Sequence, residues 1–370
     1  MPTRRTVLLA TAAALLGSTG TDPAAAYAAG KWGSYGSPTA RLNSRTLYVD
    51  PAGTGDHRTV QAAVSATPTG TTSTTGWTVV LAAGTYREPV LVTADRRYLT
   101  LLGGTARATD VVIVYNNAAG TAKPGGGTYG TSGSATVTLL ADGFTARDVT
   151  FANDWLRADH PEFTGTQAVA VKAVGDRSAF HRCRFLGHQD TLYADSTGLG
   201  VFARQYYRQC YVEGDVDFVF GRATAVLEGC ELRTLARSVT FTPQGFVFAP
   251  STAVANPRGF LATGCTFTST APAAAYCLAR PWVPSSDTTA RPMLTIRQSA
   301  IGAGINAAAP YANMSASYPW QSQRFAEYLN TGPGAVVTVP ANRPQLTAAQ
   351  AAAHTRETYL TGSDAWQPWK

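Results

Sequence analysis

Five segments of the chain repeat one alternating pattern of apolar and polar residues. They are FTARDVTFAND (144–154), AFHRCRFLGHQD (179–190), YYRQCYVEGDVD (206–217), AVLEGCELRT (225–234) and FLATGCTFTST (260–270). Alignment superposes Asp148, Cys183, Cys210, Cys230 and Cys265, and the intervals between successive cysteines are 27, 20 and 35 residues. A constant core with variable loops is typical of stacked coils, because one coil cannot bury its apolar face alone. The repeat therefore predicts an all-β chain wound as a parallel β-helix.

The remainder of the chain favours the same fold. Short β-rich runs such as TVVLAA (78–83) and VVIVYN (111–116) dominate, and helical periodicity is confined to residues 59–66 and 348–356. An antiparallel sandwich would also contain many short strands, but it has no reason to keep one side-chain register through five segments. The apolar residues after the aligned positions should form one stack: Val149, Phe185, Val212, Leu232 and Phe267.

The N-terminal residues are typical of an export signal. Arg4 and Arg5 precede an apolar run at 7–16, and the small residues at 26–28 suit a signal peptidase. The paired arginines fit either a twin-arginine signal or an ordinary one. An apolar run of this length is too short to span a bilayer, which takes about 20 residues. We therefore expect a signal peptide over residues 1–28 and a secreted, extracellular protein that does not enter membranes.

The mature part, residues 29–370, contains no linker that would divide it. The low-complexity stretches at 67–76 and 120–133 are short and are followed at once by strand-like sequence, so we expect a single domain. The whole chain has 30 Lys and Arg against 23 Asp and Glu, a formal charge of +7 at pH 7. Such a charge can attract polyanions or simply maintain solubility. The chain has no Lys/Arg-rich run with interleaved aromatics, so nucleic acid is not an expected partner.

Two aspartates hold the same position in neighbouring repeats. Asp190 lies seven residues after Cys183, and Asp217 lies seven residues after Cys210. Neighbouring strands are about 4.8 Å apart, so the two carboxylates should meet within about 5–6 Å. Two acids this close separate their pKa values and can serve as an acid and a base. Aspartate is also a common turn former, so the register alone leaves a structural role open.

Three short blocks resemble the signatures of the pectinesterase family. They are GHQDTLY (187–193), GDVDFVFG (214–221) and LARPW (278–282), and they stand in the family's order. The resemblance extends through VDPAGTGDHRTVQAAV (49–64), GTYREPVLV (84–92), TSGSATVTLLADGFTARDVTFAND (131–154), GTQAVAV (165–171) and EYLNTGPGA (327–335). It implies a right-handed parallel β-helix. It also implies a monomer that hydrolyses the methyl esters of polygalacturonate in pectin (methyl-esterified homogalacturonan), with no metal and no cofactor.

The resemblance also assigns roles to the two acids. It implies that Asp217 is the nucleophile, which attacks the ester carbonyl, and that Asp190 is the general acid and then the general base. An arginine beside only one of them, Arg280, should lower the pKa of Asp217, and the resulting charge should raise the pKa of Asp190.

Five further residues receive roles from the same resemblance. Gln189 and Gln167 would donate amide hydrogen bonds to the developing oxyanion. Arg280 would orient Asp217 through a two-pronged guanidinium–carboxylate contact. Trp282 and Phe220 would form a stacking wall for the sugar ring. Taken singly, each of these side chains has an ordinary structural explanation, and their ordered combination is what favours a catalytic site.

The cysteines allow at most two disulfides and one leftover thiol. The aligned register and a similar cysteine pair in bacterial relatives imply a disulfide between Cys210 and Cys230. The same register also permits Cys183 with Cys210, and the pairing of Cys265 and Cys277 is left open. No Cys or His cluster has the spacing of metal ligands.

Some positions depart from the family pattern. His188 stands where the family often has an aromatic or an amide, and LARPW replaces the commoner LGRPW. Asp215 is an added acid that we expect to point away from Asp217. No role is assigned to His160 or His188. Substrate preference is expected to vary through the loops at 155–165 and 238–256.

Two other classes of function are compatible with the same fold. A polygalacturonate lyase would need an acidic calcium cluster, and a glycosidase would need carboxylates about 5–10 Å apart across a glycosidic bond. A non-catalytic polysaccharide-binding β-helix would not need a buried acid pair flanked by amides. The combination of Gln189, Asp190, Asp217 and Arg280 favours the esterase, although a relative that acts on another ester would share it.

Overall fold

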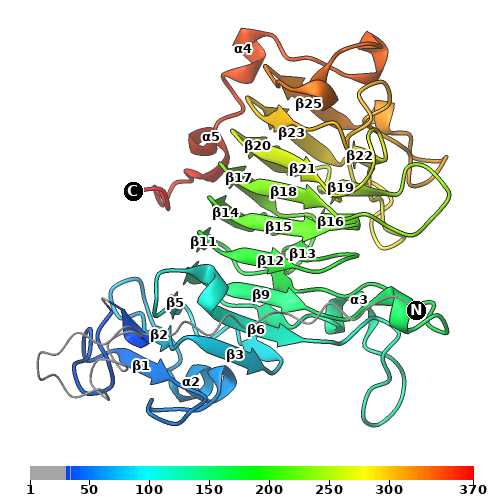
Figure 1. Ribbon diagram of the computed structural model, residues 1–370. Helices are drawn as coiled ribbons and strands as arrows, with labels where there is room; N and C mark the ends of the chain where they lie inside the picture. The colour runs from blue at the N-terminus through cyan, green and yellow to red at the C-terminus, as the bar shows by residue number, and fades with distance from the viewer. Residues whose placement is uncertain (1–30, 34) are drawn as a thin grey trace, which may run out of the picture.

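Successive strands of the chain pass in turn to three parallel sheets, so that the backbone winds coil upon coil (Figure 1). The computed structural model describes residues 31–33 and 35–370. The predicted all-β parallel β-helix is confirmed. The predicted signal peptide, residues 1–28, lies outside the described residues. In the described part, no helix is long and apolar enough to cross a membrane.

The sheets of the described residues contain ten, eight and seven strands and are called sheets 1, 2 and 3. Sheet 1 contains β1 (Thr46–Val49), β2 (Thr78–Leu81), β5 (Thr100–Gly103), β8 (Thr145–Arg147), β11 (Ser178–His181), β14 (Arg204–Arg208), β17 (Thr224–Glu228), β20 (Phe260–Thr263), β23 (Met293–Arg297) and β25 (Arg324–Tyr328). Sheet 2 contains β3 (Gly84–Arg87), β6 (Val111–Tyr115), β9 (Thr150–Asn153), β12 (Arg184–Leu186), β15 (Tyr211–Gly214), β18 (Glu231–Thr234), β21 (Thr266–Ser269) and β24 (Ala300–Ile301). Sheet 3 contains β4 (Val90–Val92), β7 (Val137–Leu139), β10 (Val171–Ala173), β13 (Leu192–Ala194), β16 (Val216–Gly221), β19 (Gly245–Pro250) and β22 (Tyr276–Ala279).

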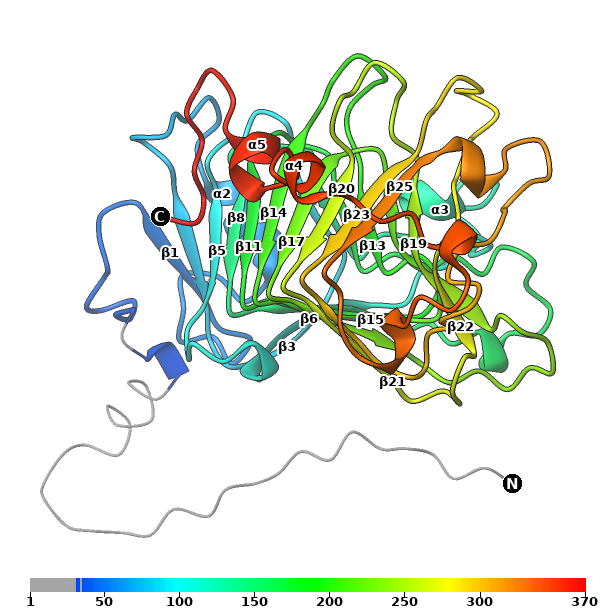
Figure 2. The ribbon, with the colours of Figure 1, turned by 90° about the horizontal axis from the view of Figure 1, so that it is seen from above.

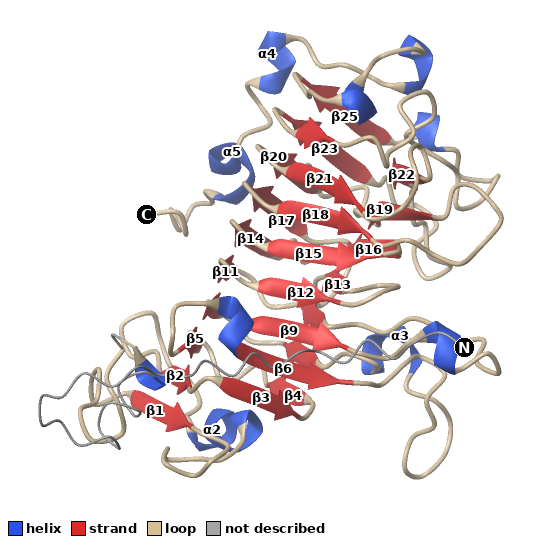
Figure 3. Cartoon of the chain, in the orientation of Figure 1, coloured by secondary structure: helices blue, strands red, loops and turns tan. Residues whose placement is uncertain are grey.

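Helices are short and lie around the coils (Figure 3). They are α2 (Val60–Ala66), α3 (Gly130–Gly133), α4 (Ala348–Ala351), α5 (Arg356–Leu360) and the 3₁₀ turns η1 (Ala108–Asp110), η2 (Arg157–Asp159), η3 (Trp320–Ser322), η4 (Pro333–Ala335) and η5 (Pro340–Asn342). The helix predicted at 59–66 is confirmed as α2. The side chain of Thr59 caps its N-terminus by accepting a hydrogen bond from the amide of Ala62. The periodic stretch at 348–356 is not one helix, since α4 ends at Ala351 and Thr355 caps a new one.

A single left-handed residue turns the chain from sheet 1 to sheet 2 in six successive coils. These residues are Asp148 (φ 57), Arg182 (φ 51), Gln209 (φ 52), Gly229 (φ 61), Gly264 (φ 61) and Gln298 (φ 50). Glycine adopts this conformation without penalty, whereas a residue with a Cβ needs support from its surroundings. The turn therefore recurs through the repeat, but only its two glycines are visible in the sequence.

This turn corrects the predicted alignment of the first repeat. The register of β9 against β12 places Cys183 beside Val149 and not beside Asp148. The alignment is therefore wrong by one residue there, and Phe151 takes the position predicted for Val149. The other members of the predicted stack are confirmed on successive rungs: Phe185, Val212, Leu232 and Phe267. The ring of Phe151 stacks on that of Phe185 at 5.7 Å between centroids, so the interior is continuous across the corrected rung.

The repeat's four cysteines stack in the interior and are almost fully buried: Cys183, Cys210, Cys230 and Cys265. The predicted Cys210–Cys230 disulfide is wrong, because all five cysteines of the described residues, Cys277 included, are free thiols. The Sγ atoms of Cys210 and Cys230 instead face the carbonyl oxygens of Phe180 and Tyr207, at 3.4 and 3.3 Å. Strands in register hold successive Cβ atoms about 4.8 Å apart, whereas a bridge needs about 3.5–4.5 Å. A shared register thus does not by itself bring two sulfurs into bonding distance.

The C-terminal segment returns along the outside of sheet 1 (Figures 1 and 2). There Tyr359 and Leu360 of α5 pack against an apolar patch on the strands of sheet 1, which consists of Tyr206, Val226, Leu261 and Met293. Trp366 and Trp369 extend this contact beyond the helix. The outer face of sheet 1 is therefore partly covered, while the outer face of sheet 3 carries the hollow described next.

Candidate active site

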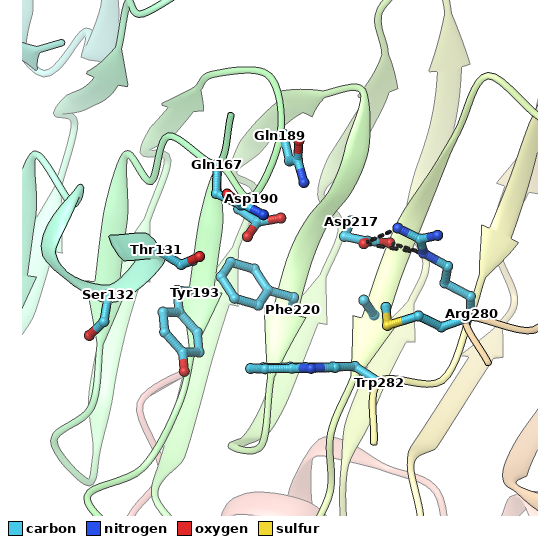
Figure 4. A pocket seen from close by; sticks show the side chains of 12 residues that line it. Thr131, Ser132, Gln167, Gln189, Asp190, Tyr193, Asp217, Phe220, Arg280 and Trp282 are labelled. Carbon is cyan, nitrogen blue, oxygen red and sulfur yellow. Dashed lines mark hydrogen bonds and ion pairs between the residues drawn. The ribbon is translucent and has the colours of Figure 1, made fainter. Parts of the chain in front are cut away.

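A hollow of about 450 Å³ on sheet 3 brings together every catalytic and substrate-binding residue predicted from the sequence (Figure 4). Its lining consists of Thr131, Ser132, Gln167, Gln189, Asp190, Tyr193, Asp217, Phe220, Ala249, Arg280, Trp282 and Met314. These residues come from seven successive coils, from the coil of α3 and β7 to the segment around Met314. The stacking of the coils brings the lining residues together in one site.

Backbone hydrogen bonds between coils set the two acids on neighbouring rungs. The Asp190 amide donates to the carbonyl of Val216 at 3.0 Å, next to Asp217. One coil earlier, the amide of Ala168 donates to the carbonyl of Gln189 at 3.1 Å. Gln167, Gln189 and the acids are therefore held by the sheet's own hydrogen bonds, and their relative positions do not depend on mobile loops.

Both acids adopt the left-handed backbone conformation, with φ 66 at Asp190 and φ 51 at Asp217. Aspartate tolerates this region better than most residues, but it still costs on the order of 1–3 kcal/mol. In β16, the register against β19 shifts between Val216 and Val219, so Asp217 sits in a bulge. A bulge redirects a side chain that regular alternation would place elsewhere. The geometry explains how Asp217 comes to face the hollow beside Asp190.

Arg280 binds Asp217 through two of its nitrogen atoms. Its Nε donates to Oδ1 at 2.8 Å and its Nη2 donates to Oδ2 at 2.6 Å. The guanidinium carbon lies 4.3 Å from the ring centre of Phe246, and the Arg280 amide donates to the carbonyl of Phe248 at 3.0 Å. The Phe246 ring packs against the guanidinium, and the backbone hydrogen bond to Phe248 anchors Arg280 to the sheet. The predicted two-pronged contact is present.

The pKa values of the two acids are raised to different degrees. Burial, and then the charge of Asp217, raise the pKa of Asp190 well above its ordinary value. Burial also raises the pKa of Asp217, although the hydrogen bonds and charge of Arg280 act against it. Arg280 lowers the pKa of Asp217, as predicted, but burial of the carboxylate outweighs the arginine, so the net shift of that pKa is upward. The predicted order is kept, since Asp217 ionises before Asp190.

Gln189 is oriented by two donors that the sequence did not reveal. Its Oε1 accepts hydrogen bonds from Nη2 of Arg157 at 3.1 Å and from the hydroxyl of Thr166 at 2.7 Å. With the oxygen occupied, the amide nitrogen is left to donate, and it points toward Asp190 (Figure 4). Arg157 is itself held by Asp215, whose Oδ2 accepts from its Nη1 at 3.1 Å. Asp215 thus pairs with Arg157, while Asp217 pairs with Arg280. Residues two apart in a regular strand share a face, so the bulge at Asp217 accounts for their different partners.

Asp215 is buried among positive groups. Its Oδ2 lies 3.6 Å from Nδ1 of His188 and 3.8 Å from Nε of Arg237. Burial would raise the pKa of Asp215, but the contacts with His188 and Arg157 outweigh it and hold the pKa below its ordinary value. His188 thus lies beside the added acid. His160 lies elsewhere and stacks on Trp155 at 5.3 Å between ring centres.

An aromatic wall closes one side of the hollow. Trp282 lies 5.8 Å from the ring centre of Phe220, which stacks on Tyr193 at 4.2 Å. The Trp282 amide donates to the carbonyl of Pro250 at 2.9 Å and fixes the indole to the sheet. Figure 4 shows the three rings on one side of the acids. Flat apolar surfaces beside polar groups are what a sugar ring requires.

Comparison with known proteins identifies the family. The Pectinesterase family model matches residues 46–363. The chain belongs to the pectinesterase family. As a pectinesterase, it is an enzyme that hydrolyses carboxylic esters. The family match covers all three sheets and every lining residue of the hollow.

Individual relatives of this pectinesterase agree in sequence and in structure. A pectinesterase of Ralstonia solanacearum is 34% identical over 332 residues, which are 82% of this chain and 83% of the relative. Pectin methylesterase PemA from Erwinia chrysanthemi has a TM-score of 0.76 at 28% identity, over 89% of this chain and 99% of its own. A pectin methylesterase in complex with a hexasaccharide has the same TM-score and identity, over 87% and 98%.

Sequence reasoning missed several residues of the pectinesterase site. Tyr193 lies within GHQDTLY, so its place in the wall could have been read from that block. Thr131, Ser132 and Met314 line the hollow from α3 and from a loop near residue 314. Arg157 and Thr166 approach from the long loop at 155–165 and its end. Thr131, Ser132 and Thr166 lie within blocks that resemble the family, but no motif marks Arg157 or Met314. The path of a loop is not encoded in the register of the coils.

Proposed function

We propose that this pectinesterase removes methyl groups from polygalacturonate and releases methanol and a free carboxylate. The observation that carries the proposal is the arginine-bound Asp217 next to a buried Asp190 of raised pKa, in one hollow with two amide side chains. The hexasaccharide complex of a similar pectin methylesterase supports an oligosaccharide substrate. The aromatic wall of Trp282, Phe220 and Tyr193 offers that substrate a stacking surface.

The first step forms an acyl-enzyme. A carboxylate oxygen of Asp217 attacks the ester carbonyl carbon, and the carbonyl oxygen becomes an oxyanion. The amides of Gln189 and Gln167 donate to that oxyanion, and each such donor contributes about 3–4 kcal/mol to the transition state. The oxyanion then collapses and the bond to methanol breaks. Protonated Asp190 gives its proton to the departing methoxide, so methanol leaves as a neutral molecule.

The second step restores the enzyme. Asp190 is now a carboxylate and takes a proton from water as the water oxygen attacks the substrate carbonyl carbon of the anhydride. The bond between that carbon and Asp217 breaks, so Asp217 returns to its carboxylate form and Asp190 to its protonated form. One group serves as acid and then as base. The second proton of the water stays on the product carboxylic acid and passes to solvent when that acid ionises.

The setting of the activity is part of the same proposal. Residues 1–28 would direct export, and the domain at 29–370 would act outside the cell as a monomer on pectin. A net positive charge assists the approach to a polyanionic polysaccharide. No nucleic acid, membrane, metal or cofactor is invoked in any step.

A product analysis separates this function from its rivals on the same fold. Purified protein is incubated with methylated pectin and, in parallel, with polygalacturonate. The proposal predicts methanol from the first and neither new reducing ends nor unsaturated ends from either. Reducing ends would support a glycosidase, and unsaturated ends would support a lyase. An absence of all three products would support a binding protein or an esterase with another substrate.

A further inference from the structure

A second hollow, of about 220 Å³, lies on the outer face of sheet 1. Its lining consists of Arg147, His181, Arg182, Arg208, Gln209, Pro368, Trp369 and Lys370. The active-site hollow lies on sheet 3, and Figure 2 shows the strands β8, β11 and β14 of sheet 1 on a different side from β13, β19 and β22. None of the residues of this second hollow takes part in the proposed reaction.

Three of its residues form a ladder across neighbouring strands. Arg147 of β8 lies beside His181 of β11, which lies beside Arg208 of β14. Adjacent rungs are about 4.8 Å apart, so two guanidinium groups flank one imidazole. Arg182 and Lys370 also line the hollow.

The positive charge of this ladder is not neutralised by the carboxylates around it. Asp148 is occupied by Arg182, whose Nε and Nη2 donate to it at 2.8 and 2.6 Å. Glu228 follows Arg208 along the rungs, but Arg356 binds it at 2.7 Å. In the described part of the chain the Arg147 guanidinium has no hydrogen bond or ion pair, and that of Arg208 donates only to the carbonyl of Trp369 at 3.2 Å.

His181 is buried to 5% exposure and its ring makes no hydrogen bond among the described residues. Its one ring contact is an edge-on approach to Tyr206 at 5.9 Å. Burial, with the charges of Arg147, Arg208 and Arg182, lowers the pKa of His181 to about 4. The imidazole is therefore neutral at pH 7 and has an N–H donor. The ring nitrogens have no protein partner in the described part of the chain and are not sealed from solvent, so a ligand in the hollow can accept a hydrogen bond from the N–H group.

We propose that this hollow is a second, non-catalytic site that binds an oxyanion group. Guanidinium groups on two rungs and an imidazole N–H between them match the acceptors of a carboxylate or a phosphate. Two sources fit this chemistry: the uronate carboxylate of a de-esterified polygalacturonate, and free inorganic phosphate. Trp369 lines the same hollow. The proposal goes beyond the esterase activity and does not depend on it.

The full mature protein is titrated with sodium phosphate and, separately, with an oligogalacturonate, in low salt. The readout is the ring nitrogen resonances of its five histidines, His57, His160, His181, His188 and His354, in ¹⁵N-histidine-labelled protein. The His181 signal reports on the second hollow alone, so binding near Arg280 cannot be mistaken for it. Arg147→Gln is the test variant, because it removes a charge without removing a hydrogen bond or an ion pair among the described residues. Arg233→Gln on sheet 2, which also has no ion pair, is its charge-matched control.

The expected result is a saturable shift of the His181 resonance. We expect its affinity to fall at least about fivefold in Arg147→Gln and to stay unchanged in Arg233→Gln, with ester hydrolysis unaffected by either. A lower dissociation constant for the oligogalacturonate than for phosphate would assign the site to uronates, and a response to phosphate alone would assign it to the free anion. The proposal is overturned if neither anion shifts His181, or if the two variants weaken binding equally, since that is non-specific screening. His181→Phe, which keeps the ring contact with Tyr206, should abolish the heat of binding in calorimetry.

Discussion

Asp190 and Asp217 lie in adjacent coils, one in a turn and one in a strand. Their surroundings differ although the two side chains are identical. Both aspartates are left-handed, both are buried, and both face one hollow. Asp217 is bound by Arg280, whereas no side chain of the described residues donates a hydrogen bond to the carboxyl group of Asp190. Burial raises both pKa values, but Arg280 restrains that of Asp217 and the charge of Asp217 adds to that of Asp190. In the proposed mechanism, the partner of each aspartate, and not its position in the coil, separates the nucleophile from the general acid.

Neutralising Asp217 should have the largest effect on activity. In Asp217→Asn we expect methanol release from pectin to fall on the order of 10⁴-fold or more, because an amide cannot form the anhydride. Initial rates of methanol release measure the loss, and far-UV circular dichroism checks the fold. A variant that retains more than about a tenth of wild-type activity would remove Asp217 from the role of nucleophile.

Weakening the partner of Asp217 should have the next largest effect. Arg280→Lys keeps the charge but loses the planar fork, so we expect kcat/KM to fall about 100-fold. With less opposition to burial, the pKa of Asp217 should rise further. The acid limb of the pH profile should therefore move to higher pH, which rate measurements across the pH range will detect. A near-wild-type rate with an unmoved acid limb would give Arg280 a peripheral role.

A smaller effect is expected from the donors that orient Gln189. Thr166→Val removes one of the two hydrogen bonds to Oε1, so we expect kcat to fall about tenfold with KM little changed. A double-mutant cycle with Gln189→Ala isolates the coupling: in the Gln189→Ala background, Thr166→Val should have almost no effect. An equal loss in both backgrounds would show that Thr166 supports the fold and not the amide. Arg157→Lys should behave as Thr166→Val does.

The smallest effect is on stability and concerns Asp190. Its pKa is raised on folding, so the unfolded chain releases a proton above about pH 4 that the folded protein retains. The stability contributed by Asp190 is complete below that pH and is lost as the pH rises toward the folded value. Asp190→Asn avoids this loss, so its free energy of unfolding at pH 7 should exceed the wild-type value by about 1 kcal/mol or more, and the difference should vanish near pH 4. Urea titrations at both pH values measure it, and a difference that does not grow with pH would contradict the raised pKa.

The register of the coils made much of this molecule predictable. Cys183 and Cys210 align Asp190 with Asp217 because parallel strands in register transmit one spacing from coil to coil. The family blocks added Arg280 and Trp282, which the repeat alone could not connect to the acids. These residues lie on or directly beside strands, where sequence position determines location.

Other features depend on interactions that a linear pattern does not contain. Arg157 reaches Gln189 from a loop, and only the folded path of that loop brings them together. The net pKa shift of Asp217 depends on how deeply the carboxylate is buried, which the presence of Arg280 in the sequence cannot tell. The disulfide was predicted from register, but register fixes which rungs are neighbours and not how closely two sulfurs approach.

Single-turnover kinetics of Asp217→Asn and Asp190→Asn on a methyl ester and on an ester with a better leaving group test the assigned roles most directly. An activated leaving group needs no proton, so it should recover part of the acylation rate in Asp190→Asn and none in Asp217→Asn. That pattern is the one predicted if Asp217 is the nucleophile and Asp190 the acid. Recovery in Asp217→Asn and not in Asp190→Asn would mean that the two roles are reversed.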